Sequence, residues 1–127
     1  IMRTLKERIS ASKRFLLLVG NKTKDDDDFV PAEIEYAAKK CGLPILVCYV
    51  NEKNRIVEFV PQRLKNLWPP SLKKLMDDEE VKTIHIPFRE LIISKAINDY
   101  DFNNQPSYAC GIYKESVYDQ LYDKGEI

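Results

Sequence analysis

The fold is decided by an apolar run at Phe15–Val19 (FLLLV), which Gly20 closes. Such a run, ended by a turn residue, is typical of a central strand covered on both faces. A second run at Pro44–Val50 (PILVCYV) predicts another buried strand. Between them, residues 29–41 carry apolar side chains at helical spacing, which predicts a helix with one buried stripe: Val30, Ile34, Ala37, Ala38 and Cys41. We expect Asp28 to cap this helix. Strand, helix and strand in this order predict a right-handed parallel crossover, so the fold class is α/β.

The elements on either side follow from the same spacing rules. Residues 1–11 read as the end of an amphipathic helix, with Met2, Leu5 and Ile9 on one face. Prolines restrict the segment after the second strand to short helices near 62–67 and 71–77. A third strand is expected near 81–86. A helix ending near Tyr100 should follow, lined by Phe88, Leu91, Ile92, Ala96 and Ile97.

The tail from residue 101 is rich in tyrosine. Tyr113, Val117 and Leu121 recur at helical spacing, so we expect either a last helix or an interface element. No internal repeat or linker interrupts the chain. We therefore expect a single domain over residues 1–127.

Composition excludes several classes of function. Twenty basic and twenty acidic residues cancel, so binding of nucleic acid through bulk charge is not expected. No apolar run approaches the roughly 20 residues that span a bilayer. The three cysteines form no C-x-x-C pair and no segment resembles a signal peptide, which favours a cytoplasmic location. The single histidine, His85, lies in an apolar strand and is expected to be structural, so any chemistry should rest on carboxylates.

Two motifs near the first strand are weak. Asn21-Lys22-Thr23-Lys24 has the form of a guanine-reading N-K-x-D segment, but Lys24 stands where the aspartate is needed. No phosphate-binding G-x-x-x-x-G-K-[ST] loop is present either. The run Asp25–Asp28 lacks the spaced ligands of a calcium loop, and we expect a solvated loop that holds no metal.

Glu33 is the stronger candidate. Helical geometry places it on the shoulder of the buried stripe, where a carboxylate can lean over the strand ends. Ligands of open α/β sheets bind beyond the carboxyl ends of the strands, which is where this helix begins. An acidic residue in a first turn can equally be a favourable contact with the helix dipole, so the residues alone leave both readings open.

A combination of elements in the first half resembles a known family. Ser12 precedes the apolar strand, Gly20 and Thr23 follow it, and the segment Phe29-Val30-Pro31-Ala32-Glu33-Ile34 opens the helix before the second strand. This order and spacing resembles the TIR-like domain of bacterial Thoeris antiphage systems, of the ThsB type. The resemblance covers about residues 5–51 well and the remainder in outline.

The resemblance implies a flavodoxin-like, three-layer fold with a mostly parallel sheet, and cleavage of the bond between nicotinamide and ribose in NAD. Its catalytic glutamate falls on Glu33, and Phe29 stands where the family has a tryptophan. Gly20, Asn21 and Thr23 would line the strand-end side of the same pocket. NAD would be the substrate, and neither a cofactor nor a metal would be needed.

The same resemblance implies partners and one departure. Family members make a cyclic ADP-ribose-type messenger that switches on an effector protein, and catalytic members self-associate. TIR domains also begin with a strand and loop that supply the other wall of the pocket, and we expect that first strand to be missing from this chain. Two alternatives stay open: a non-catalytic TIR-like or receiver-like interaction module that uses the tyrosine-rich tail, and a nucleoside-processing transferase.

Overall fold

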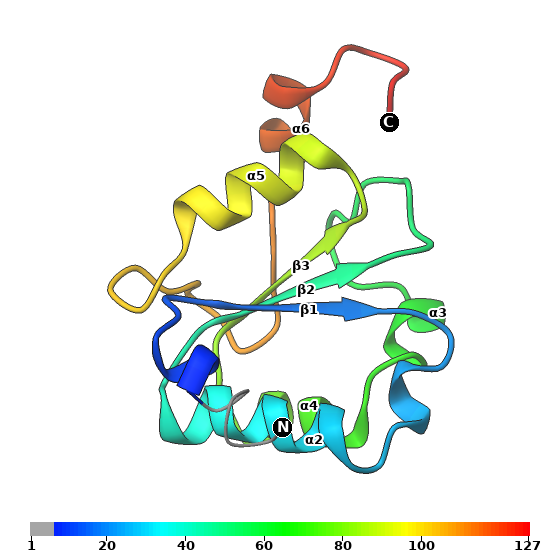
Figure 1. The fold of residues 1–127 in the computed structure, drawn as a ribbon. Helices are drawn as coiled ribbons and strands as arrows, with labels where there is room; N and C mark the ends of the chain where they lie inside the picture. Colours follow the sequence, from blue (N-terminus) through cyan, green and yellow to red (C-terminus); the bar gives the residue numbers. More distant parts are fainter. Residues whose placement is uncertain (1–6) are drawn as a thin grey trace.

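The computed structural model describes residues 7–127 and contains a four-stranded sheet with flanking helices (Figure 1). Its order is β1-β2-β3-β4, and every neighbouring pair is parallel. The strands are β1 (Phe15–Val19), β2 (Ile45–Tyr49), β3 (Thr83–Pro87) and β4 (Gly111–Ile112). The α/β class and the parallel crossover between β1 and β2 are confirmed.

The helices form layers on the two faces of the sheet. They are η1 (Thr23–Asp25), α2 (Phe29–Glu35), η2 (Tyr36–Lys40), α3 (Gln62–Lys65), α4 (Pro70–Asp77), α5 (Glu90–Asp99) and α6 (Glu115–Leu121). Figure 1 shows α2 and α4 below the sheet and α5 above it. This three-layer arrangement is consistent with the flavodoxin-like, TIR-like fold implied by the resemblance.

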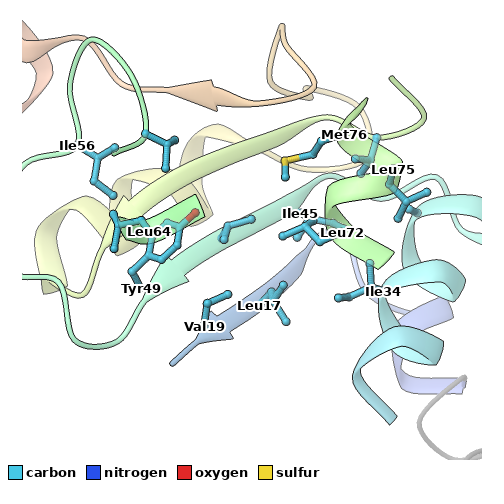
Figure 2. Close-up of a cluster of buried hydrophobic side chains, with 14 residues drawn as sticks. Leu17, Val19, Ile34, Ile45, Tyr49, Ile56, Leu64, Leu72, Leu75 and Met76 are labelled. Carbon is cyan, nitrogen blue, oxygen red and sulfur yellow. The ribbon is translucent and has the colours of Figure 1, made fainter. Parts of the chain in front are cut away.

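Two buried clusters hold the layers together. On the face under α2 and α4, strand residues such as Leu17, Val47 and Tyr49 pack against Ile34 and Leu72 (Figure 2). On the other face, α5 and α6 cover β2 and β3 through this set: Leu46, Cys48, Ile84, Ile86, Ile92, Ala96, Tyr113, Tyr118 and Tyr122. Burial of these apolar side chains is the main source of stability.

The expected position of the first strand is wrong. β1 lies at the edge of the sheet, not at its centre. Leu17 and Val19 are buried, but Leu16 and Leu18, on the face covered elsewhere by α5, remain 40% and 48% exposed. They lie beside Leu46 and Cys48 of β2 in register, yet α5 packs over β2 and β3. In the described part of the chain, therefore, no helix covers one face of β1.

The predicted helix over 29–41 forms in two pieces. α2 is α-helical, whereas η2 is a π-helical turn. Ile34, Ala37 and Ala38 are buried as expected, while Val30 and Cys41 are only half-buried. The expected cap is also wrong, because the side chain of Asp28 makes no capping bond. Instead, Oδ1 of Asp26 accepts hydrogen bonds from the N–H groups of Asp28 and Phe29, both at 2.9 Å.

The remaining predictions hold with some corrections. The chain is helical at residues 7–10, and Ile9 packs on Ala37 and Leu43, while Met2 and Leu5 fall outside the described residues. In α5, Ile92 and Ala96 are buried, but the expected core residues Phe88 and Leu91 are exposed, because α5 has only a narrow contact with the sheet.

The tail forms one element that the sequence did not predict. The two-residue strand β4 pairs with β3, and a Cβ on Gly111 would come within 2.6 Å of the carbonyl oxygen of Thr83. The helix predicted from the tyrosine spacing is confirmed as α6. The side chains of Tyr113, Tyr118 and Tyr122 are buried, so these residues belong to the core.

Candidate active site at the carboxyl end of β1

A hydrogen bond from the backbone to the side chain of Thr23 closes the loop after β1. The N–H of Gly20 donates to Oγ1 of Thr23 at 2.8 Å. A Cβ at Gly20 would lie 3.2 Å from the side chain of Val50, so glycine allows the ends of β1 and β2 to stay close. Asn21 is exposed and Thr23 half-buried. Thr23 thus fixes the shape of the loop, and the side chains of Asn21 and Lys22 reach solvent.

Glu33 lies on α2, the helix that this loop leads into. Its side chain is half-buried, and among residues 7–127 no group forms a hydrogen bond or an ion pair with its carboxylate. Burial raises the pKa of Glu33 above its ordinary value, and the nearby charge of Asp26 raises it further. A carboxylate that is partly desolvated and has no partner is typical of a functional position more than of a structural one.

Phe29 shares a face of α2 with Glu33. The two residues are four positions apart, so their side chains are neighbours on the helix surface. The ring of Phe29 is 47% exposed. The structure therefore places an accessible aromatic ring and an unpartnered carboxylate on one side of α2, while Gly20, Asn21 and Thr23 form the loop before it.

Three cavities with walls formed by described residues lie away from Glu33. One of about 620 Å³ adjoins Arg55 and Tyr122, one of about 490 Å³ adjoins Lys13 and Phe102, and one of about 300 Å³ adjoins Phe88. None of these three has Glu33 in its wall. Glu33 thus lies on α2 and outside these three cavities.

A second polar cluster, which the sequence did not reveal, surrounds His85 in the core. His85 and Thr83 are fully buried on β3, and Tyr49 is buried beside them on β2. The hydroxyl of Tyr49 is 2.6 Å from Nδ1 of His85, and Oγ1 of Thr83 is 2.9 Å from Nε2. Burial lowers the pKa of His85 to about 3, so the ring is neutral at physiological pH.

The hydrogen bonds of this cluster run in one direction. Nε1 of Trp68 can only donate, and it donates to the Tyr49 hydroxyl at 2.7 Å. Tyr49 then donates its own proton to Nδ1 of His85, which leaves the ring proton on Nε2. That proton is donated to Thr83, whose hydroxyl donates to the carbonyl of Ala109 at 2.6 Å. With both ring nitrogens occupied, His85 has the structural role that the sequence predicted.

The described residues show no sign of a metal site or a disulfide. Within residues 7–127, no group of three or more His, Cys, Asp or Glu side chains is arranged to hold a metal ion. The aspartates at 25, 27 and 28 are exposed, and Asp26 is half-buried. Cys41, Cys48 and Cys110 are all free thiols. The helices described in this part of the chain lack the length and apolar character needed to cross a bilayer.

Comparison with protein families bears on the N-terminal part of the chain. Residues 1–55 match the family model of the Thoeris protein ThsB, TIR-like domain. The resemblance drawn from the sequence is confirmed over this segment. The ThsB match contains β1, α2 and β2 together with all five expected site residues, and it associates this segment with antiphage defence signalling.

Proposed function

We propose that this protein is a signalling enzyme of antiphage defence that cleaves the nicotinamide–ribose bond of NAD and forms a cyclic ADP-ribose-type product. The observation that carries the proposal is the carboxylate of Glu33, which is half-buried and without a partner among residues 7–127. It lies at the end of the sheet where open α/β folds bind ligands. The ThsB match spans the same residues.

Glu33 has the chemistry that this reaction needs. As nicotinamide leaves, positive charge develops on the ribose ring, and a nearby carboxylate stabilises that charge more in the transition state than in the ground state. A raised pKa also makes the carboxylate a better acceptor of hydrogen bonds from the ribose hydroxyls. Holding the sugar in this way orients the bond that breaks.

The other residues of the site have supporting roles in this proposal. The exposed ring of Phe29 offers a face on which a planar base can stack. The amide of Asn21 can donate to substrate oxygens, and Thr23 keeps the loop in place through its bond to Gly20. Capture of the ribose by water gives ADP-ribose, and capture by a group of the same molecule gives a cyclic messenger that would reach an effector protein by diffusion. Self-association is part of the proposal as well.

The test compares Glu33→Gln with a matched substitution. Glu35 lies on the same helix but is exposed, so Glu35→Gln controls for loss of a carboxylate from α2. With NAD as substrate and chromatography of the products, we expect Glu33→Gln to lower kcat by about 10²–10³-fold. Glu35→Gln should retain the activity of the parent protein. Equal turnover in all three proteins would remove Glu33 from the mechanism.

A second candidate function is a non-catalytic interaction module. The uncovered side chains of Leu16 and Leu18 on an edge strand favour it, because exposed apolar strand surface is typical of interaction sites. Three tyrosines of the tail do not support it, since Tyr113, Tyr118 and Tyr122 are buried, whereas Tyr108 is 71% exposed. Calorimetric titration with a non-hydrolysable NAD analogue separates the two functions, because the module should give no binding heat.

A further inference from the structure

A buried carboxylate lies just beyond the carboxyl end of β2. The side chain of Glu52 is only 5% exposed. Its Oε1 accepts the N–H of Asn54 at 3.1 Å, and its Oε2 forms an ion pair with Nη2 of Arg63. A buried carboxylate is costly unless it is paired, and Arg63 is the cationic partner of Glu52.

Arg63 is far from saturated by this ion pair. Its side chain is 63% exposed on α3, although its partner is almost completely covered. A guanidinium carries five N–H donors in a planar fork, and Glu52 is the one acidic partner seen among residues 7–127. The ion pair thus holds one edge of the guanidinium while the remaining donors face solvent. A fork of this kind matches the geometry of phosphate oxygens.

Arg63 lies on α3, beside the loop after β1 that leads to α2 and Glu33. The N–H of Val50 donates to the carbonyl of Val19 at 3.0 Å, which joins the ends of β1 and β2. Nζ of Lys24 donates to the carbonyl of Asn66 at 3.0 Å, which joins the loop after β1 to the end of α3. Figure 1 shows α3 beside this loop, at the end of the sheet to which the arrows of β1 and β2 point.

Lys24 thus adds a second cation at the end of α3, the helix that carries Arg63. Asn66, its partner, is three residues from Arg63, about one helical turn away. The exposed aspartates at 25, 27 and 28 continue from Lys24 towards α2. At this end of the sheet, Arg63 and Lys24 thus lie on or beside α3, and the aspartates lie in the loop before α2.

We propose that Arg63, together with Lys24, binds the diphosphate of a dinucleotide substrate, and that Glu52 is the positioning residue that aims the guanidinium. This rests on the proposed function and names the part of the chain that recognises the charged half of NAD. The diphosphate is held beside α3, and the ribose that loses its base extends towards Glu33. Discrimination in favour of diphosphate-containing ligands follows from this arrangement.

The test measures binding without turnover, in the Glu33→Gln background. The probes are ADP-ribose, which carries the diphosphate, and adenosine, which lacks it. The double variant Glu52→Gln/Arg63→Gln removes both charges, so no buried carboxylate is left without a partner. Lys39→Gln is the control. Lys39 lies on η2, away from α3, and the substitution breaks its exposed ion pair with Glu80.

We expect the double variant to bind ADP-ribose about ten- to a hundredfold more weakly by calorimetry, with binding of adenosine unchanged. Arg63→Lys keeps the charge opposite Glu52 but loses the planar guanidinium, so its affinity for ADP-ribose should be intermediate. If the double variant does not fold, the affinity of Arg63→Lys tests the proposal. Lys39→Gln should bind like the parent. Retention of full ADP-ribose affinity in both Arg63 variants, or equal affinity of the parent for ADP-ribose and adenosine, would overturn the proposal.

The two proposals can fail separately. If protein with Glu33 intact cleaves NAD but the Arg63 variants leave KM for NAD unchanged, the diphosphate site is wrong and the proposed function stands. If ADP-ribose binding depends on Arg63 but NAD is not cleaved by protein with Glu33 intact, the enzymatic proposal is wrong and the diphosphate site stands.

Discussion

The acid–base groups His85 and Glu33 lie in surroundings of opposite character. Around His85, both ring nitrogens are hydrogen-bonded, the group is fully buried and its pKa is lowered to about 3. At Glu33, the carboxylate is half-buried, has no partner among residues 7–127 and has a raised pKa. A shifted pKa alone does not mark a functional group. The presence or absence of bonded partners separates a structural cluster from a site that can accept a ligand.

Replacing His85 should produce the largest effect on stability. His85→Ala leaves a cavity and deprives both Tyr49 and Thr83 of a buried partner. We expect a loss of about 3–5 kcal/mol in the free energy of unfolding, measured by urea denaturation. An exposed substitution such as Lys124→Ala should change it by less than about 0.5 kcal/mol. A loss below about 1 kcal/mol for His85→Ala would show that the cluster contributes little.

Acidification should reveal the same cluster without a mutation. The unfolded chain binds a proton on His85 below its ordinary pKa of 6.5, whereas the folded chain does not until about pH 3. Stability is therefore lost as pH falls from 6.5 towards 3, by about 1.4 kcal/mol per pH unit once below 6.5. Denaturation midpoints at pH 7, 6 and 5 measure this slope. The slope over this range should disappear in His85→Gln, and its persistence there would assign it to another group.

Protonation of Glu33 should affect stability in the opposite direction to protonation of His85. Its main effect should be on the pH dependence of activity. Its raised pKa means that the folded chain takes up this proton at higher pH than the unfolded chain, so its protonation favours the folded state. Because the proposed mechanism needs the ionised form, the acid limb of kcat/KM for NAD should have its midpoint above 4.5.

Asp26→Asn sharpens this test of the acid limb. It removes a like charge from the surroundings of Glu33, so it should move the midpoint to lower pH. Asp28→Asn should leave the midpoint unchanged, since Asp28 is exposed and is not among the causes of the shift. A profile that is identical for Asp26→Asn and the parent protein would exclude coupling between Asp26 and Glu33.

The smallest expected effect is that of Glu33→Gln on folding. Because Glu33 has no bonded partner in the described structure, the substitution should change the free energy of unfolding by less than about 0.5 kcal/mol. Urea denaturation of the variant and of Glu35→Gln measures this. A large destabilisation would show that Glu33 has a structural role.

The first strand shows what could be predicted from the sequence and what could not. Its existence and length follow from five apolar residues before a glycine, and the structure confirms both. Its neighbours depend on contacts from other segments. Leu16 and Leu17 are alike in the sequence but not in burial, because α5 covers only β2 and β3 on that face.

The candidate site divides in the same way. Helical spacing was enough to place Glu33 on the shoulder of α2, since burial follows the period of the helix. The cap came from Asp26 instead of Asp28, because four adjacent aspartates offer no signal as to which one faces the helix end. The partners Glu52 and Arg63 are separated by a proline-containing loop, and those of His85 are spread over several elements. Neither pairing has a spacing signature.

Among the described strands, β1 has a neighbour on one side only, and this affects how the protein must be handled. The outer backbone groups of β1 can form hydrogen bonds with a strand of another molecule, and the exposed side chains of Leu16 and Leu18 add apolar contact to such pairing. Concentrated samples of this chain should grow particles in light scattering, and a lysine introduced at Leu16 should delay that growth while leaving the fold intact.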